Sequence, residues 1–292
     1  MDINFELYKI FYYCAQNRSF STAARKLYIS QSAVSQSIKQ LEKQLGVTLF
    51  FRKSRAIQLT SEGEILFSYA SQAFNFLKTA ETKLQEIEGL RSGEINIGVS
   101  DSICKYFIMP YIEKFGQLYP KVAIKIINRT TPQLLEVLKN GLVDMVISTL
   151  PVNSDIFNST KFIEVNDIFV ASEKFAELKN RKITLRELNG YPLVMLQSNS
   201  STRKSINAFF AVKGLTCSPE IELESLELLI EFALIGTGIA YVLKESASEH
   251  INTGRLFEIS TDEKLPPRDI GIVTMKNVIP SKAVKTFIDI LL

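Results

Sequence analysis

The sequence contains a single histidine, no tryptophan and only three cysteines among its 292 residues. Cys14, Cys104 and Cys217 are widely spaced and odd in number, which argues against a disulfide framework and favours a reducing compartment. A zinc site needs several Cys or His ligands at short spacings, and His250 alone cannot supply them. The G-x-S-x-G and P-loop motifs are also missing. We therefore expect a protein that is not an enzyme, with no catalytic residues, no metal and no cofactor.

Long hydrophobic runs are missing as well. No apolar stretch approaches the ~20 residues of a membrane span, and the first residues, MDINFELYKI, lack the pattern of a signal peptide. The composition, 46% hydrophobic and 22% charged, is ordinary for a soluble globular protein. The length exceeds one typical core and predicts two or three folding units. We expect a cytoplasmic protein that has no membrane partner.

Charge is unevenly distributed along the chain. The first 60 residues contain nine Lys and Arg against three acids, a net charge of +6, whereas the rest carries a net charge of −3. A basic segment joined to a mildly acidic one is typical of proteins that bind a polyanion. The bias therefore indicates nucleic acid as a partner of the first 60 residues.

Three helices are predicted in this basic segment. Apolar residues at helical spacing predict a first helix from about residue 5. Ser19 is a suitable N-cap for a second helix through FSTAARKLY, and Ser30 for a third, QSAVSQSIKQLEKQL, which ends at Gly46. At about 100° per residue, the third helix has one apolar stripe, made of Val34, Ile38, Leu41 and Leu45.

The opposite side of the third helix carries groups that can bind DNA. Its hydroxyl, amide and ammonium groups belong to Ser32, Ser35, Gln36, Lys39 and Lys43. Such groups donate to phosphates and to base edges in the major groove, and the nearest carboxylate, Glu42, lies at the edge of this side. Beyond Gly46, two apolar runs flank a basic stretch, which predicts a hairpin with a cationic tip beside the helix.

The motifs SFSTAARKL, SQSAVSQSIKQLEKQLG, LFFR and LTSEG closely resemble the N-terminal domain of LysR-type transcriptional regulators, nearly continuously over about 60 residues. Ser32 stands where the family often has proline, which changes the first turn of the helix but not its position. The resemblance implies a winged helix-turn-helix over residues 1–60 that binds double-stranded promoter or operator DNA. It implies base or phosphate contacts from Gln31, Ser32, Ser35, Gln36 and Lys39, and a wing that contains Arg52, Lys53 and Arg55.

Residues 61–90 are predicted to form one long linker helix. Thr60 is a suitable N-cap, and Glu62 and Glu64 fit the first turn. Apolar residues recur every three or four positions, at Ile65, Tyr69, Ala73, Phe76, Ala80, Leu84 and Ile87. A solitary helix would leave this stripe in water, so we expect it to pair with a second copy; packing on the chain's own body is the alternative. In the LysR family this helix is the dimerisation element.

From residue 91 onwards, strand and helix patterns alternate, which predicts parallel sheets with crossover helices. We expect lobe I to contain residues 91–162 and 266–292, and lobe II residues 163–265. The order resembles the effector domain of LysR-type regulators, which is similar to type 2 periplasmic solute-binding proteins. The predicted fold is thus multidomain: a winged helix-turn-helix, a linker helix and an α/β effector domain of two Rossmann-like lobes.

Hydroxyl-rich segments follow several predicted strands, where open α/β sheets bind ligands. Some lead into helix N-termini, which favour anions, although Ser and Thr are also common helix caps. We expect a small polar or carboxylate-bearing effector bound between the lobes by Ser100, Asp101, Ser102, Thr130, Thr131, Ser148, Asn199, Ser201 and Thr202. The resemblance singles out Ser100, Thr130, Ser201 and Thr202, and we expect Gly238 and Ile239 in IGTGIAY to line the same cleft.

Asp101 leaves the charge of the effector open. Its carboxylate would repel an anion unless it pairs with Arg129 or Arg203, and it can instead bind an amino group. An anionic and a zwitterionic effector are therefore both compatible with the sequence.

The leading hypothesis is a sequence-specific transcriptional regulator of the LysR type that forms a dimer or tetramer, with RNA polymerase as a further candidate partner. One alternative is a redox sensor that uses Cys104 and Cys217, although these lie 113 residues apart on different predicted lobes, with only Lys105 nearby to lower a thiol pKa. The other is a small-molecule-binding α/β protein that does not bind DNA.

Overall fold

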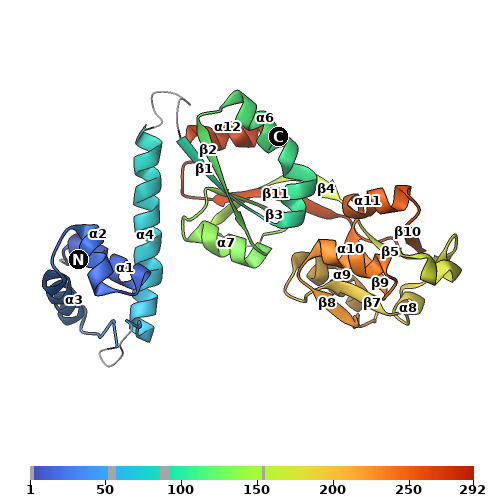
Figure 1. Cartoon of the computed structure of the whole chain (residues 1–292), viewed down its shortest axis with the longest axis horizontal. Coiled ribbons are helices and arrows are strands. Elements are labelled where there is room, and N and C mark those ends of the chain that lie inside the picture. Colours follow the sequence, from blue (N-terminus) through green and yellow to red (C-terminus); the bar gives the residue numbers. More distant parts are fainter. Residues whose placement is uncertain (1–2, 52–56, 86–92, 153–154) are drawn as a thin grey trace. The chain divides into compact units, whose positions relative to one another are not determined.

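The computed structural model describes residues 3–51, 57–85, 93–152 and 155–292, and the chain forms two compact units (Figure 1). Helices α1 to α4 build the first unit, and the elements from β1 to α12 build the second. Within the described ranges, no helix is long and apolar enough to cross a membrane.

Three short helices enclose most of the first core, and their bounds are α1 Phe5–Asn17, α2 Phe20–Leu27 and α3 Gln31–Leu45. The predicted caps are confirmed: the Ser19 hydroxyl accepts from the Thr22 N–H at 3.2 Å, and the Ser30 hydroxyl from the Ala33 N–H at 3.1 Å. Gly46 ends α3 with a left-handed φ of 71°. The predicted inner stripe of α3 packs into this core.

Helix α4, Ser61–Gln85, begins at its predicted N-cap. Thr60 Oγ1 accepts a hydrogen bond from the Gly63 N–H at 3.0 Å and donates one to the Thr48 carbonyl at 2.6 Å. Gly63 lies so close to the preceding segment that a Cβ atom there would be 2.2 Å from the Leu49 carbonyl oxygen. A residue without a side chain is therefore needed where the chain enters α4.

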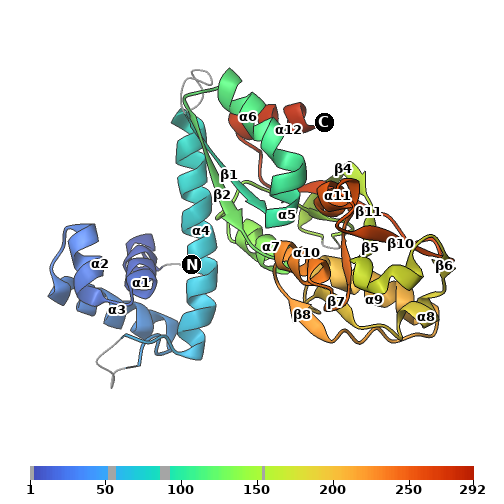
Figure 2. The same ribbon diagram turned by 45° about the vertical axis from the view of Figure 1, so that its right-hand side comes forward.

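The second unit contains a five-stranded sheet in the order β2-β1-β3-β11-β4, which we call lobe I together with its helices. Its strands are β1 Gly93–Val99, β2 Val122–Asn128, β3 Met145–Thr149, β4 Phe157–Val165 and β11 Arg268–Met275. One face packs against α6 (Met109–Leu118) and α12 (Lys282–Leu291), and the other against α7 (Thr131–Lys139), as Figure 2 shows. The short helix α5 (Asp101–Ile103) and the π-helical turn η2 (Cys104–Ile108) connect β1 to α6.

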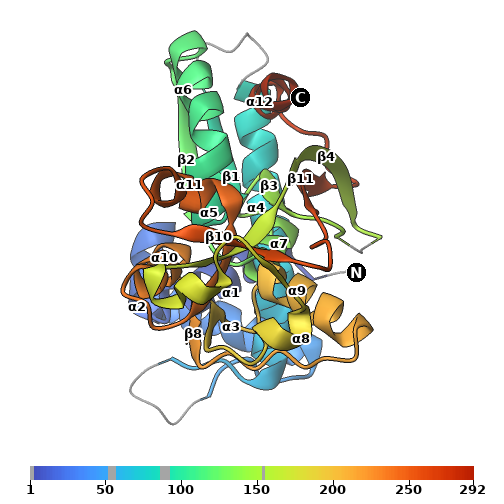
Figure 3. The ribbon, with the colours of Figure 1, turned by 90° about the vertical axis from the view of Figure 1, so that its right-hand side faces the viewer.

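A six-stranded sheet in the order β6-β10-β5-β9-β7-β8 forms lobe II. Its strands are β5 Asp167–Ala171, β6 Lys182–Ile183, β7 Leu193–Leu196, β8 Ile221–Leu223, β9 Ile239–Leu243 and β10 Phe257–Thr261. Helices α10 (Leu226–Leu234) and α11 (Lys244–Asn252) cover one face, and α8 (Leu185–Leu188) and α9 (Ser201–Val212) the other (Figure 3).

Both sheets are mixed, whereas the alternation of elements predicted parallel ones. β11 runs antiparallel to β3 and β4, and β5 runs antiparallel to β9 and β10. The segment Glu173–Leu178 is a 3-10 helix with a kink at Phe175. Helix α11 was not predicted, because its sequence KESASEHIN has no apolar stripe at helical spacing.

The chain passes between the two sheets twice. Only Asn166 separates the end of β4 from the start of β5, and the second passage lies between the end of β10 and Arg268, the first residue of β11. The predicted residue ranges of the domains and lobes stay a prediction. The two passages place Asp167 and Arg268 in direct contact.

Candidate nucleic-acid interface and ligand site

The outer face of α3 is accessible in the first unit. Gln31, Ser32, Gln36 and Lys39 are exposed and Ser35 is half-buried. Ser30 and Ser32 share a hydrogen bond between their hydroxyls at 2.9 Å, which orders the first turn where the family often has proline. The five predicted DNA contacts therefore lie on one helix, most of them with their polar groups in solvent.

Glu42 is not at the edge of this face, as the sequence suggested, but buried, with 9% of its surface exposed. Its Oε1 accepts backbone hydrogen bonds from Leu49 at 2.8 Å and from Phe50 at 3.4 Å. The carboxylate thus joins α3 to the segment that follows it. Its inward position leaves the outer face of α3 without a carboxylate, which sequence periodicity alone did not resolve.

Only the base of the predicted wing can be placed. Phe50 and Leu59 form an antiparallel bridge, and the Phe51 N–H donates to the Gln58 carbonyl at 3.0 Å. Arg52, Lys53 and Arg55 lie outside the described residues.

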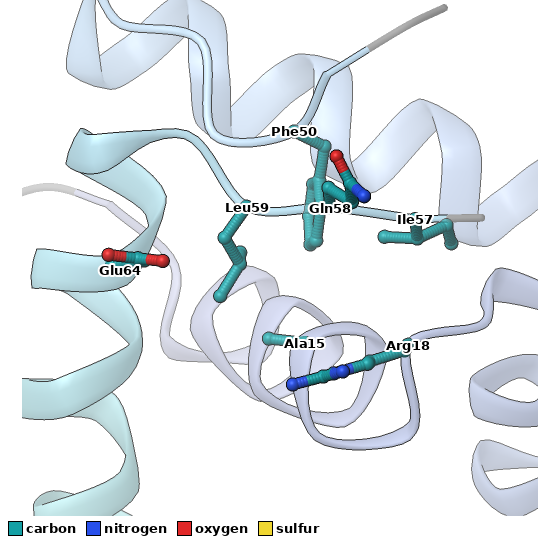
Figure 4. A pocket seen from close by; sticks show the side chains of 7 residues that line it. All are labelled: Ala15, Arg18, Phe50, Ile57, Gln58, Leu59 and Glu64. Atoms are coloured by element: carbon teal, nitrogen blue, oxygen red, sulfur yellow. The ribbon is translucent and has the colours of Figure 1, made fainter. Parts of the chain in front are cut away.

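A pocket of about 280 Å³ lies beside this hairpin base (Figure 4). It is lined by Ala15, Arg18, Phe50, Ile57, Gln58, Leu59 and Glu64. Figure 4 shows Arg18 extending along one side from α1 and Glu64 entering from α4. Among the described residues, none of those predicted for DNA or effector binding lines this pocket.

In lobe I, the predicted effector residues meet at one edge of the sheet. β1 runs parallel to β2 and β3, and Val99 pairs with both Asn128 and Ile147. The segments Ser100–Ser102 and Thr130–Thr131 therefore begin side by side at the carboxyl ends of their strands. Thr130 is partly occupied by a local contact, because its hydroxyl and its N–H both lie 3.2 Å from Gln133 Oε1.

Asp101 binds neither of the arginines that the sequence suggested. Asn128 Nδ2 donates to the Asp101 carboxylate, whereas Arg129 donates to the Asn128 carbonyl at 2.8 Å. Arg203 forms an ion pair with Glu222 at 2.9 Å. Of the two alternatives that the sequence left open for Asp101, the arginine pair is not formed, and the carboxylate bonds to Asn128 at the edge of lobe I.

Ser148 differs from the other predicted residues because it is only 1% exposed. Its Oγ has no hydrogen-bond partner among the described residues. It lies within β3, opposite Gly271 of β11. A ligand at the strand ends would have to reach into the sheet to contact it.

In lobe II, Asn199, Ser201 and Thr202 follow the carboxyl end of β7 and lead into α9. Asn199 is exposed, and the other two are half-buried. Ser200 caps α9, because its hydroxyl accepts from the Arg203 N–H at 3.1 Å. Asn199, Ser201 and Thr202 thus lie together at one edge of the lobe II sheet.

Gly238 and Ile239 lie at the opposite edge, which corrects the expectation of a shared cleft. β9 runs parallel to β7, and Leu193 at the start of β7 pairs with Ile239. Both residues are buried, and a Cβ atom on Gly238 would lie 2.6 Å from the Pro192 carbonyl oxygen. Gly238 therefore allows β9 and the segment before β7 to approach closely. The sequence interpretation misplaced both residues because the direction of β9 was not known from the motif.

A buried polar cluster, which the sequence did not predict, lies where the chain passes between the lobes. Arg268 donates to the Asp167 carboxylate through Nε and through Nη2, the latter at 2.8 Å from Oδ1, and its Nη1 lies 2.9 Å from Thr149 Oγ1. Asp167 is 3% and Arg268 9% exposed. Burial lowers the pKa of Arg268, but the hydrogen bonds and charge of Asp167 outweigh it and the net shift is upward. We call Thr149, Asp167, Tyr241 and Arg268 the inter-lobe cluster.

The two cysteines of the redox hypothesis lie in different hydrophobic cores. Cys104 packs against the lobe I core and Cys217 lies in the lobe II core, with its sulfur 3.2 Å from that of Met195. Burial raises the pKa of both thiols, with Asp101 adding to the effect at Cys104. Lys105, expected to lower a thiol pKa, instead pairs with Glu227 at 2.8 Å. Neither thiol has the environment of a reactive thiolate.

Two family models match nearly the whole chain. Residues 5–64 match the bacterial regulatory helix-turn-helix protein, lysR family, and residues 88–292 match the LysR substrate binding domain. The chain belongs to the LysR family. It is therefore a transcriptional regulator with a DNA-binding and a substrate-binding domain, and its family is not one of enzymes.

Relatives of similar length support this membership. The HTH-type transcriptional activator CmpR of Synechocystis sp. is 30% identical over 97% of this chain and 93% of that protein. The HTH-type transcriptional regulator CbbR of Rhodospirillum rubrum is 28% identical over 91% and 88%. Among solved structures, a full-length OxyR variant from Pseudomonas aeruginosa has a TM-score of 0.75 at 20% identity, covering 100% of this chain and 95% of that one. The LysR-family regulator CbnR has a TM-score of 0.68 at 15% identity over 99% and 98%. These two structures show a shared fold.

Proposed function

We propose that this LysR-family regulator contacts operator DNA through the outer face of α3, with Gln31, Ser32, Ser35, Gln36 and Lys39. The observation that carries the proposal is the charge of this face: its hydroxyl, amide and ammonium groups are accompanied by no carboxylate, because Glu42 bonds inward. Amide and hydroxyl groups donate to and accept from base edges, and Lys39 is suited to a phosphate. Arg52, Lys53 and Arg55 of the hairpin are proposed to add contacts beside the helix.

The effector is proposed to be a small polar molecule that carries a carboxylate and binds between the lobes. Its contacts are Ser100, Asp101, Ser102, Thr130, Thr131, Asn199, Ser201 and Thr202. Hydroxyls at the carboxyl ends of parallel strands support this placement. Because Asp101 has no arginine partner among the described residues, an amino group on the effector is favoured as well.

A second copy of the chain is proposed to cover α4. Ile65, Tyr69, Leu77 and Leu84 are 62%, 69%, 49% and 67% exposed, whereas another face of the helix packs on α1, for example with Phe74 4.9 Å from Tyr12 between ring centroids. Exposed apolar side chains at helical spacing favour a helical partner. We infer a cytoplasmic dimer or tetramer, with RNA polymerase as a further partner on promoter DNA.

The DNA contact is tested with the genomic fragment that the wild-type chain selects from its own genome. Gln36→Ala should weaken binding to this fragment by about 1–3 kcal/mol, the energy of one good base contact, and weaken binding to random DNA much less. Gln117→Ala, on α6 of the second unit, is the matched control and should change neither affinity. Equal affinity of Gln36→Ala and wild type for the selected fragment would contradict the proposed face.

The effector class is tested by a thermal-shift screen of the full chain with amino acids, organic acids and inorganic anions. A ligand at 100 times its dissociation constant adds about 2.7 kcal/mol of stability. Asp101→Asn should weaken binding of an amino acid and strengthen binding of a simple organic acid. Stabilisation by inorganic anions alone, unaffected by Asp101→Asn, would argue against a zwitterionic effector.

A further inference from the structure

The inter-lobe cluster lies at the two chain segments that connect the lobes. Any change in the angle between the lobes must bend these segments. Asp167 is the first residue of β5, two residues beyond the end of β4, and Arg268 is the first residue of β11. Arg268 pairs with Val165 across β11 and β4, so both connections are in register at this point. Its guanidinium then reaches Asp167 in lobe II and Thr149 in lobe I.

The ion pair of this cluster is buried on both sides, with side chains 9% and 0% exposed for Arg268 and Asp167. The Arg203–Glu222 pair of lobe II differs, because the Glu222 side chain remains 42% exposed. A buried ion pair contributes little net stability, since its attraction is offset by desolvation, but separating the two charges is strongly unfavourable. Such a pair is suited to fixing one relative orientation of the elements that carry it.

A second polar contact between the lobes lies in solvent. Lys105 and Tyr106 of η2 bind the Glu227 carboxylate of α10 at 2.8 and 3.1 Å. The Lys105 and Glu227 side chains are 59% and 55% exposed. Exposed pairs of this kind contribute little, so the buried cluster is the stronger of these two polar contacts.

Tyr241 places an unused donor next to the ion pair. It is 2% exposed, and its hydroxyl has no hydrogen-bond partner among the described residues. On the β5–β9 ladder Tyr241 pairs with Phe169, and Asp167 pairs with Leu243, so Tyr241 and Asp167 are diagonal neighbours on one face of the sheet. Burial of a hydroxyl without a hydrogen-bond partner costs free energy and is uncommon in folded proteins.

We propose that Asp167 alternates between two donors: Arg268 holds it in the present arrangement, and the Tyr241 hydroxyl binds it when the lobes rotate. Thr149, Arg268 and Tyr241 are then positioning residues for the effector response, so the inference rests on the proposed function. Rotation that separates Arg268 from Asp167 would otherwise leave a buried carboxylate unpaired, and Tyr241 supplies the replacement hydrogen bond. The two arrangements become close enough in free energy for a small ligand to select between them.

The test measures the distance between the lobes in the full chain without DNA or effector, so that failure of either binding proposal does not affect it. Spin labels are attached at Lys114→Cys on α6 and Lys204→Cys on α9, both exposed positions, in a Cys104→Ser background. Labelled chains are diluted with unlabelled ones so that each oligomer carries one labelled copy. Cys14 and Cys217 are buried and stay unlabelled.

The wild-type chain should give one narrow distance distribution. Arg268→Gln should add a second distance as the larger population, and the double variant with Tyr241→Phe should lose that second peak and become broad. Tyr241→Phe alone should keep the wild-type distance. Thr149→Val removes only the hydrogen bond between Arg268 and Thr149 and should widen the distance distribution. This variant provides the test if Arg268→Gln does not fold.

Two variants separate a positioning role from a structural one. Arg203→Gln breaks a buried arginine's pair within lobe II and should lower the melting temperature with no change of distance. Glu227→Gln breaks the exposed contact and should leave the distance unchanged. The proposal is overturned if folded Arg268→Gln or Thr149→Val retains the wild-type distribution, if Tyr241→Phe has no effect in the Arg268→Gln background, or if Glu227→Gln shifts the distance more than Arg268→Gln does.

Discussion

Among the described residues, each unit buries one carboxylate, and the sequence separation between the carboxylate and its partners differs greatly between the two units. In the first unit, Glu42 accepts hydrogen bonds from backbone N–H groups seven and eight residues away. In the second unit, Asp167 binds Arg268, which is 101 residues away. Glu42 joins α3 to the segment that follows it, whereas Asp167 joins the two chain passages between the lobes.

The comparison shows how a buried carboxylate controls the charge that a ligand meets. Because Glu42 bonds inward, the outer face of α3 presents only neutral and cationic groups to a polyanion. Because Asp167 neutralises Arg268, the guanidinium between the lobes is already occupied. The first arrangement supports a surface that binds DNA, and the second supports a fixed relation between two lobes.

The largest effect is expected from Asp167→Ala. It leaves the Arg268 guanidinium buried without its partner, which typically costs about 3–5 kcal/mol. Hydrogen exchange of the β5 and β9 amides in the full chain, followed by mass spectrometry, measures the loss of stability in the second unit. The amides of α1 to α3 serve as the internal control and should be unaffected. A loss below 1 kcal/mol would mean that the pair is not buried as described.

Gly63→Ala is expected to destabilise the first unit by about 1–3 kcal/mol, because the added methyl group would lie against the Leu49 carbonyl oxygen. Gly116→Ala is the matched control: it also lies in a helix, but a Cβ atom there meets nothing within 4 Å. That change should be neutral or stabilise the second unit by up to about 1 kcal/mol. Urea unfolding of both variants compares them, and equal effects would exclude a close approach at Gly63.

Glu42→Gln is expected to have a smaller effect, about 0.5–1.5 kcal/mol, because the amide oxygen still accepts from the Leu49 N–H but the charge is lost. Glu42→Ala should cost more, since it leaves two buried N–H groups with no acceptor. Urea unfolding should therefore give Glu42→Ala a lower free energy of unfolding than Glu42→Gln. If Glu42→Ala were as stable as Glu42→Gln, the carboxylate would not join α3 to the hairpin.

The sequence predicted the first unit better than the second, and the range of the contacts explains why. Caps at Ser19, Ser30 and Thr60 bond to N–H groups three residues away, so local sequence determines them. The inner stripe of α3 follows from helical periodicity alone. The inward turn of Glu42 was missed because its partners belong to the next element.

In the second unit, alternation of strands and helices predicted two α/β lobes, but strand direction needed the structure. Gly238 and Ile239 were placed at the wrong edge because β7 and β9 are parallel, and Gly238 precedes β9 while Ile239 is its first residue. The inter-lobe cluster combines residues from β3, β5, β9 and β11, and no sequence pattern joins them. The contacts of Asn128 and Arg268 likewise depend on elements far apart in the chain.

The most direct test of the α3 interface is the salt dependence of binding to the selected genomic fragment. A phosphate contact through Lys39 predicts that Lys39→Ala reduces the slope of log affinity against log salt concentration by about 0.9. Lys114→Ala removes the same charge from α6 of the second unit and should leave the slope unchanged. Equal slopes for wild type, Lys39→Ala and Lys114→Ala would contradict the interface.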